Sequence, residues 1–146
     1  MKIVLDTNIW ISAIIWGGKP DEILRLRERE LFTIAISQQL LNELETTLNK
    51  KKFQPKLKAL NLTVFSVSNL ILKSAILYSI DDLVVPELRD PNDNIILATA
   101  IAANADIIIT GDQDLLILAQ YQNIQIMTAK NFLQQYFNYY EYNELT

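Results

Sequence analysis

The residues with the clearest chemical potential are two aspartates that follow apolar, strand-forming runs. Asp6 comes directly after the run 3–5, and Asp112 comes one turn after the run 107–109. In an open α/β sheet, ligands bind in the crevice beyond the carboxyl ends of the strands. A carboxylate at such a depth is costly unless a cation or hydrogen bonds compensate for it. We therefore expect both side chains to line a crevice at one edge of a sheet.

A second pair of acids, Asp90 and Asp93, precedes the alanine-rich segment 95–105, which has the character of a helix. Asp90 as an N-cap, with Pro91 at the first helical position, gives this stretch an ordinary structural explanation. Acids in the first turn also favour the helix dipole by roughly 0.3–1 kcal/mol each. Asp93 gains a chemical interpretation only because its helix is expected to begin at the same sheet edge as Asp6.

Structural roles compete with the chemical interpretation at the other aspartates as well. Asp6 is a good candidate N-cap for a helix that begins near Asn8. Asp114 is well placed to cap a helix that begins at Leu115, and we expect it to have that role. Asp112 is then left without an obvious structural duty, which favours a place for it in a site.

The helix expected at 38–49 carries two further acids beside an apolar stripe of leucines at helical spacing. Glu43 and Glu45 flank this stripe on its two sides, so periodicity does not choose between them. From spacing alone, a solvated surface position is the simpler interpretation of either glutamate.

The composition limits which chemistry these acids can serve. The chain of 146 residues contains no histidine and no cysteine, which excludes Cys/His zinc sites, disulfides and histidine-based nucleophilic catalysis. A metal would have to be held by oxygen ligands, which suits Mg²⁺, Mn²⁺ or Ca²⁺. Converging carboxylates repel one another unless a cation compensates them. A divalent cation at such a site suits hydrolysis of a phosphodiester.

The formal net charge of -4 on its own argues against a nucleic-acid partner. The distribution of charge tempers that argument, because the basic residues are clustered. One cluster is Lys50, Lys51, Lys52, Lys56 and Lys58, and the other is Arg25, Arg27 and Arg29. No apolar run approaches the roughly 18 residues that a membrane span requires, so we expect a soluble, cytoplasmic protein.

Strand-like and helix-like segments alternate along the chain. We expect strands at 2–6, 32–36, 83–86, 107–110 and 124–127, and a weaker strand or connector at 61–67. We expect helices at 8–16, 19–29, 38–49, 68–77, 95–105, 115–120 and 130–137, and a short one after Pro55. This alternation predicts an α/β protein with three layers, α/β/α, around a largely parallel sheet. We expect one domain at 1–138 and a short polar, aromatic tail at 139–146.

Three motifs together resemble the PIN-domain nucleases, most closely the VapC-like toxins of bacterial and archaeal toxin–antitoxin pairs. The motifs are Leu5-Asp6-Thr7-Asn8, Asp90-Pro91-Asn92-Asp93-Asn94 and Thr110-Gly111-Asp112-Gln113-Asp114-Leu115-Leu116. The resemblance covers nearly the whole chain in order and spacing. It implies a catalytic, metal-binding site formed by Asp6, Glu43, Asp93 and Asp112, and it thereby favours Glu43 over Glu45. It also implies supporting positions for Thr7, Asn8, Asp90, Thr110 and Asp114.

The resemblance further implies an endoribonuclease that depends on Mg²⁺ or Mn²⁺ and uses water as the nucleophile. It implies an RNA substrate, a homodimer and a cognate antitoxin protein as partners. A non-catalytic RNA-binding module on the same fold is the main alternative. A phosphatase with an aspartyl nucleophile or a phospho-acceptor domain fits less well. The first strand ends in Asp6-Thr7-Asn8 rather than Asp-x-Asp, and Lys130 is a weak match to the lysine of a phospho-acceptor domain.

Overall fold

A computed structural model of the chain describes residues 1–80 and 91–137, and of residues 91–93 it describes only the backbone. Within these ranges six strands form one sheet in the order β3-β2-β1-β4-β6-β5. Neighbouring strands are parallel except for β5, which is antiparallel to β6. The strands are β1 (Lys2–Leu5), β2 (Thr33–Ser37), β3 (Ile76–Tyr78), β4 (Ile107–Ile109), β5 (Gln120–Tyr121) and β6 (Ile124–Met127). The largely parallel sheet confirms the predicted α/β fold class.

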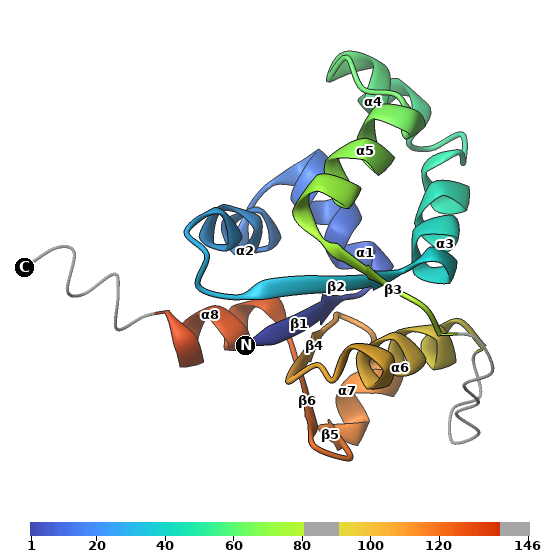
Figure 1. Cartoon of the computed structure of the whole chain (residues 1–146). Coiled ribbons are helices and arrows are strands. Elements are labelled where there is room, and N and C mark those ends of the chain that lie inside the picture. Colours follow the sequence, from blue (N-terminus) through green and yellow to red (C-terminus); the bar gives the residue numbers. More distant parts are fainter. Residues whose placement is uncertain (81–90, 138–146) are drawn as a thin grey trace, which may run out of the picture.

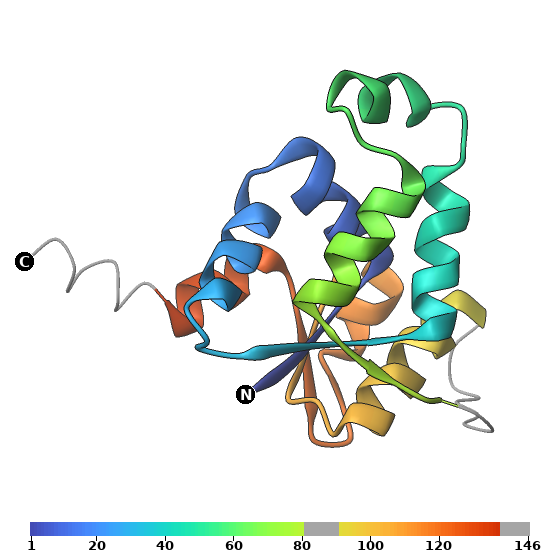
Figure 2. The same ribbon diagram turned by 45° about the horizontal axis from the view of Figure 1, so that its top comes forward.

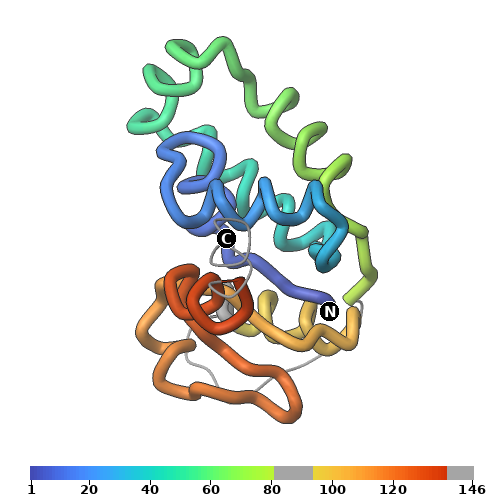
Figure 3. The backbone as a smooth tube through the Cα atoms, turned by 90° about the vertical axis from the view of Figure 1, so that its left-hand side faces the viewer, coloured from blue at the N-terminus to red at the C-terminus, as the bar shows by residue number. Residues whose placement is uncertain are grey.

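Helices cover both faces of this sheet. They are α1 (Thr7–Ile11), the π-helix η1 (Ser12–Trp16), α2 (Lys19–Glu28), α3 (Gln38–Leu48), α4 (Gln54–Ala59), α5 (Val64–Ser74), α6 (Pro91–Ala103), α7 (Gln113–Leu118) and α8 (Ala129–Tyr136). Helices α6 and α7 lie on one side, and α1, α2, α3 and α5 lie on the other (Figures 1 and 3). Helix α8 packs beside α2. No helix in the described ranges is long and apolar enough to cross a membrane.

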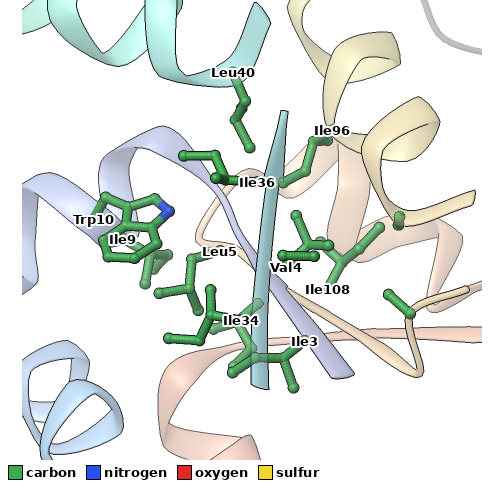
Figure 4. Close-up of a cluster of buried hydrophobic side chains, with 14 of the residues drawn as sticks. Ile3, Val4, Leu5, Ile9, Trp10, Ile34, Ile36, Leu40, Ile96 and Ile108 are labelled. Atoms are coloured by element: carbon green, nitrogen blue, oxygen red, sulfur yellow. The ribbon is translucent and has the colours of Figure 1, made fainter. Parts of the chain in front are cut away.

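The core is built around β1, whose side chains are buried on both faces of the sheet. Successive residues of a strand point to opposite faces. Leu5 accordingly packs towards Ile9 of α1, whereas Val4 and Ile108 lie on the side of Ile96 from α6 (Figure 4). Burial on both faces explains why β1 and β4 consist of continuous apolar runs. These buried strands fix the positions of the residues that follow their carboxyl ends.

The segment after α4 differs from its predicted structure. The range 61–67 was expected as a strand or connector, but α5 begins within it at Val64. The reason is a capping box, in which the Thr63 hydroxyl accepts from the Ser66 N–H (3.0 Å) and the Ser66 hydroxyl accepts from the Thr63 N–H (2.8 Å). The expected helix 68–77 consequently ends early, at Ser74, and the chain continues into the edge strand β3.

Another difference concerns the segment after α7. The helix expected at 115–120 ends at Leu118, and the next residues form the short strand β5 against β6. The strand expected at 83–86 and the tail expected at 139–146 lie outside the described residues.

The connection between α3 and α5, which contains α4, extends away from the sheet at the top of Figures 1 and 2.

Candidate functional site

The register of β1 and β4 places Asp6 beside Thr110. Leu5 pairs with Ile109, and the Asp6 N–H donates to the Ile109 carbonyl oxygen over 3.0 Å. The Thr110 hydroxyl, which is fully buried, donates to Asp6 Oδ2 over 2.7 Å. The Thr7 N–H donates to Asp6 Oδ1, also over 2.7 Å, so that Asp6 is the N-cap of α1. The carboxylate of Asp6 is therefore held in one orientation at the carboxyl edge of the sheet.

Asp112 reaches the same edge through the turn that follows β4. Its N–H donates to the Thr110 hydroxyl over 3.0 Å, so Thr110 connects the backbone of Asp112 to the carboxylate of Asp6. Asp112 Oδ1 accepts from the Asp114 N–H over 2.8 Å and caps α7, which begins at Gln113. The prediction that Asp114 caps this helix was wrong. An aspartate readily accepts from the N–H two residues later, and here that turn starts the helix.

Glu43 comes from α3, a helix that begins where the Ser37 hydroxyl accepts from the Leu40 N–H over 3.2 Å. Its side chain lies on the face of α3 that borders the cleft in front of Asp6. The same face carries Gln39, Asn42, Thr46 and Thr47. Glu45 is not among the residues that line this cleft in the described part of the chain. The packing of α3 against α1 thus separates two glutamates that periodicity could not distinguish.

A cleft of about 620 Å³ brings these residues together at the carboxyl edge of the sheet. Asp6, Glu43 and Asp112 line it from three separate segments of the chain. The other lining residues are Thr7, Asn8, Gln39, Asn42, Thr46, Thr47, Lys50, Lys52, Phe53 and Ile95. Within the described residues, the hydroxyl oxygen of Thr7 is buried and has no hydrogen-bond partner. The cleft therefore combines carboxylates, lysines and an unsatisfied buried hydroxyl, which are groups that can contact a polar ligand.

Of the fourth expected acid, Asp93, the structure describes only the backbone. Asp93 lies in the first turn of α6, whose residue Ile95 lines the cleft, but its side chain is outside the described atoms. Asp90 lies outside the described residues altogether. Among the side chains that the structure does describe, no three acids are close enough together to hold a metal ion. The donor set is nevertheless made only of oxygen atoms, which suits Mg²⁺ or Mn²⁺.

Sequence analysis did not identify several of the lining residues. Gln39, Asn42, Thr46, Thr47 and Phe53 were missed, although Lys50 and Lys52 belong to a cluster that had been singled out. Gln39, Thr46 and Thr47 stand three or four positions from Glu43. Asn42 is next to Glu43 but stands three positions from Gln39 and four from Thr46, so the polar residues occupy adjoining parts of the helix surface. A polar stripe at helical spacing around Glu43 was the signal that could have found them.

Comparison with known proteins agrees with this architecture. The sequence model of the PIN domain matches residues 2–114. The uncharacterized protein MJ1680 of Methanocaldococcus jannaschii is 29% identical in an alignment that covers 93% of this chain and 92% of the relative.

Two solved structures have a similar fold. VapBC2 from Rickettsia felis, bound to a DNA fragment from their promoter, gives a TM-score of 0.60 at 22% identity, over 86% of this chain and 97% of that one. VapBC-1 from nontypeable Haemophilus influenzae gives a TM-score of 0.54 at 17% identity, over 89% and 99%. At these identities the likeness concerns the fold.

Proposed function

The chain belongs to the PIN-domain family, and we propose that it is a divalent-metal-dependent endoribonuclease. One observation carries this proposal: Asp6, Glu43 and Asp112, from three segments that are distant in sequence, line one cleft at the carboxyl edge of the sheet. Like charges that face one cleft repel each other, and a cation bound there would offset this repulsion. The substrate would be RNA, and the reaction would be hydrolysis of its phosphodiester bonds.

The residues that would hold Mg²⁺ or Mn²⁺ are Asp6, Glu43, Asp93 and Asp112. The absence of histidine and cysteine from the sequence leaves oxygen ligands only, which both cations prefer. The unsatisfied hydroxyl of Thr7 at the cleft also supports a polar occupant. When bound, the cation supplies Lewis acidity, which offsets the charge of the phosphate and makes water a better nucleophile.

Hydrogen bonds from neighbouring groups hold the carboxylate of Asp6 and the backbone of Asp112 in place. The Thr110 hydroxyl and the Thr7 N–H hold the two oxygens of Asp6. The contact of the same hydroxyl with the N–H of Asp112 sets the spacing of the two segments. Groups that orient metal ligands in this way commonly matter almost as much as the ligands.

We assign proton transfer and substrate binding to different parts of the cleft. One of the carboxylates would accept a proton from the attacking water, whose oxygen forms the new bond to phosphorus while the bond to the leaving RNA oxygen breaks and that oxygen takes up a proton from solvent. Because water attacks the phosphorus directly, no covalent enzyme intermediate forms. Lys50 and Lys52 at the cleft would neutralise the RNA backbone, which positions the substrate without reading its sequence.

We further propose that the protein is the toxin of a toxin–antitoxin pair, acts as a homodimer and is silenced by an antitoxin protein that occupies this cleft. The likeness to the VapBC structures in fold supports this assignment. Expression of the native chain should arrest growth of a host, whereas expression of Asp6→Asn should not. Arrest by both chains would show that toxicity does not depend on the cleft.

The test of the nuclease is cleavage of a mixed RNA pool by the purified chain, with Mg²⁺ or Mn²⁺ and with EDTA. Asp6→Asn is the matched variant, because asparagine keeps the shape and the N-cap but removes the charge. The proposal predicts metal-dependent cleavage that is lost in the variant. Equal cleavage by both proteins would contradict it, and RNA binding without cleavage would favour a non-catalytic module on the same fold.

A further inference from the structure

Two aromatic rings, one of them at the cleft, each have a lysine ammonium group over the ring. Phe53 lines the cleft, and Lys52 Nζ lies 5.0 Å from the centre of its ring. Lys56, one turn further along the chain, places its Nζ 5.1 Å from the centre of the Trp16 ring. We call these four residues the aromatic–lysine strip. Each ring thus carries an ammonium group within the range of a cation–π contact.

Trp16 is the unusual member of this strip because it is far from buried. It exposes 64% of its surface, whereas Trp10, in the same helical segment, exposes 1%. The preceding residues Ala13 and Ile15 are buried, so the backbone that carries Trp16 is anchored in the core. The ring of Trp16 therefore projects into solvent from a backbone position that the core holds in place.

The backbone around Trp16 is itself unusual. Trp16 ends the π-helix η1, in which the Gly17 N–H donates to the Ser12 carbonyl oxygen over 2.9 Å. Gly17 and Gly18 then adopt φ of 75° and 74° with ψ of -142° and -150°, a region that only glycine enters at low cost. Single π-helical turns are frequent at functional sites. The local sequence therefore specifies a particular placement of Trp16.

The strip lies in a region of consistent positive charge. From Thr46 to Ile80 the sequence contains six lysines and no acidic residue, although the whole chain has a net charge of -4. Lys50 and Lys52 from this region line the cleft itself. The positive region and the carboxylates therefore meet at the cleft. An anionic polymer that follows the lysines would be led to the acids of the site.

We propose that the aromatic–lysine strip is a stacking subsite, with Trp16 as its exposed ring, that takes an unpaired base of the RNA substrate. This inference rests on the proposed nuclease function. Lysines neutralise phosphates, and aromatic rings stack on the faces of bases without regard to sequence. Bases in a duplex are already stacked on their neighbours, so they do not offer a free face to the exposed ring of Trp16. The strip thereby selects loops and single strands over helical RNA.

The test measures binding in EDTA, so that it does not depend on cleavage. A labelled single-stranded RNA is titrated with the native chain and with Trp16→Ala, Trp16→Phe and Phe65→Ala. Phe65 is a matched control, because it is also an exposed aromatic residue (76%) and does not line the cleft. Removal of Trp16 leaves no cavity in the core because its ring is exposed. A duplex and an abasic strand of the same length serve as control ligands.

The strip predicts that Trp16→Ala weakens binding of the single strand about 5- to 100-fold, as loss of one stacked base does. Trp16→Phe should retain most of the affinity, and Phe65→Ala should bind as the native chain does. Binding of the duplex and of the abasic strand should not depend on Trp16. The single strand should also quench the tryptophan fluorescence of the native chain but not that of Trp16→Ala.

Unchanged affinity of Trp16→Ala for the single strand would overturn the inference, as would an equal loss of affinity for the abasic strand. The outcomes for the strip and for the nuclease are separable. Metal-dependent cleavage together with unchanged binding by Trp16→Ala would contradict the stacking subsite and support the nuclease. Trp16-dependent binding without any cleavage by the native chain would support the strip and contradict the nuclease.

Discussion

The two ends of the central strands place the same residue type in different surroundings. At the carboxyl ends of β1 and β4, Asp6 and Asp112 share a cleft of about 620 Å³ with Glu43. At the amino end of β4, Asp106 borders a smaller pocket of about 260 Å³ and accepts from the Lys2 N–H over 2.9 Å. The other residues that line this smaller pocket are all neutral: Ala100, Ile101, Asn104, Ala105, Gln122, Asn123 and Ile124.

This difference shows what distinguishes a candidate site from a structural carboxylate. Asp6, Asp112 and Asp106 all stand next to buried strands, and all accept a hydrogen bond from a backbone N–H. Neither property separates them. What separates them is convergence: among the described residues, Asp6 and Asp112 share their cleft with an acid from a third segment, whereas the other residues that line the pocket at Asp106 are neutral. In a parallel sheet that edge is also where ligands bind.

The largest loss of cleavage and stability is expected from substitution of Asp112, because this residue has both a structural and a proposed chemical role. Asp112→Asn retains an N-cap for α7, whereas Asp112→Ala does not. Both variants should lose RNA cleavage by more than the roughly 100-fold that loss of an orienting partner costs. Only the alanine variant should also lose about 1 kcal/mol of unfolding free energy in a urea titration. Full cleavage by Asp112→Asn would show that this carboxylate serves the helix alone.

Two matched substitutions on α3 test whether cleavage depends on the glutamate that lines the cleft or on any negative charge of this helix. Glu43→Gln should reduce cleavage strongly, because Glu43 lines the cleft and is a proposed metal ligand. Glu45→Gln removes the same charge two residues away and should leave the rate of cleavage unchanged. Initial rates at saturating Mn²⁺ provide the measurement. A similar loss from both substitutions would point to a general effect of charge.

An intermediate effect is expected at Thr110, which touches both aspartates. Thr110→Val keeps the buried shape but removes the hydroxyl that donates to Asp6 and accepts from the Asp112 N–H. Cleavage should fall roughly 10- to 100-fold, as for other partners that orient metal ligands. The apparent Mn²⁺ affinity in the cleavage assay should fall with it. If the rate falls while the Mn²⁺ dependence stays the same, Thr110 does not act through metal ligands.

The smallest effect on function is expected at the other end of the strands. Asp106→Asn retains an oxygen that can accept from the Lys2 N–H, so it should leave cleavage unchanged. Unfolding free energy should fall by no more than about 1 kcal/mol, because one charge-assisted hydrogen bond becomes a neutral one. Thermal unfolding and the cleavage rate, measured side by side, provide the check. A strong loss of cleavage by Asp106→Asn would contradict the proposed functional difference between the carboxyl and amino ends of the strands.

The parts of the fold that were predictable from sequence are those that depend on local apolar runs. The runs before Asp6 and Thr110 predicted buried parallel strands, and the strand register then brings these two residues together. Capping was less predictable, because it depends on turn geometry. The turn at Asp112 and the capping box at Thr63 each start a helix earlier than apolar periodicity suggests. Short edge strands such as β3 carry little signal of their own, since their pairing partner is distant in sequence.

The candidate site shows the same division. Asp6 and Asp112 follow strands, so their place at the sheet edge could be read from the pattern of the chain. The side of α3 that carries Glu43 was different, because both flanks of the leucine stripe look alike in sequence. The packing of α3 against α1 determines which flank meets the cleft, and that is a tertiary property.

The most direct test of the central claim, that the acids at the carboxyl edge form one metal site, is a calorimetric titration with Mn²⁺. The native chain, Asp6→Asn and Asp106→Asn are compared at equal concentration, without RNA. A metal site at the carboxyl edge predicts that Mn²⁺ binds to the native chain and to Asp106→Asn with equal affinity, and that binding is lost in Asp6→Asn. Equal binding of Mn²⁺ by all three proteins would contradict this site, because it would place the metal away from the cleft.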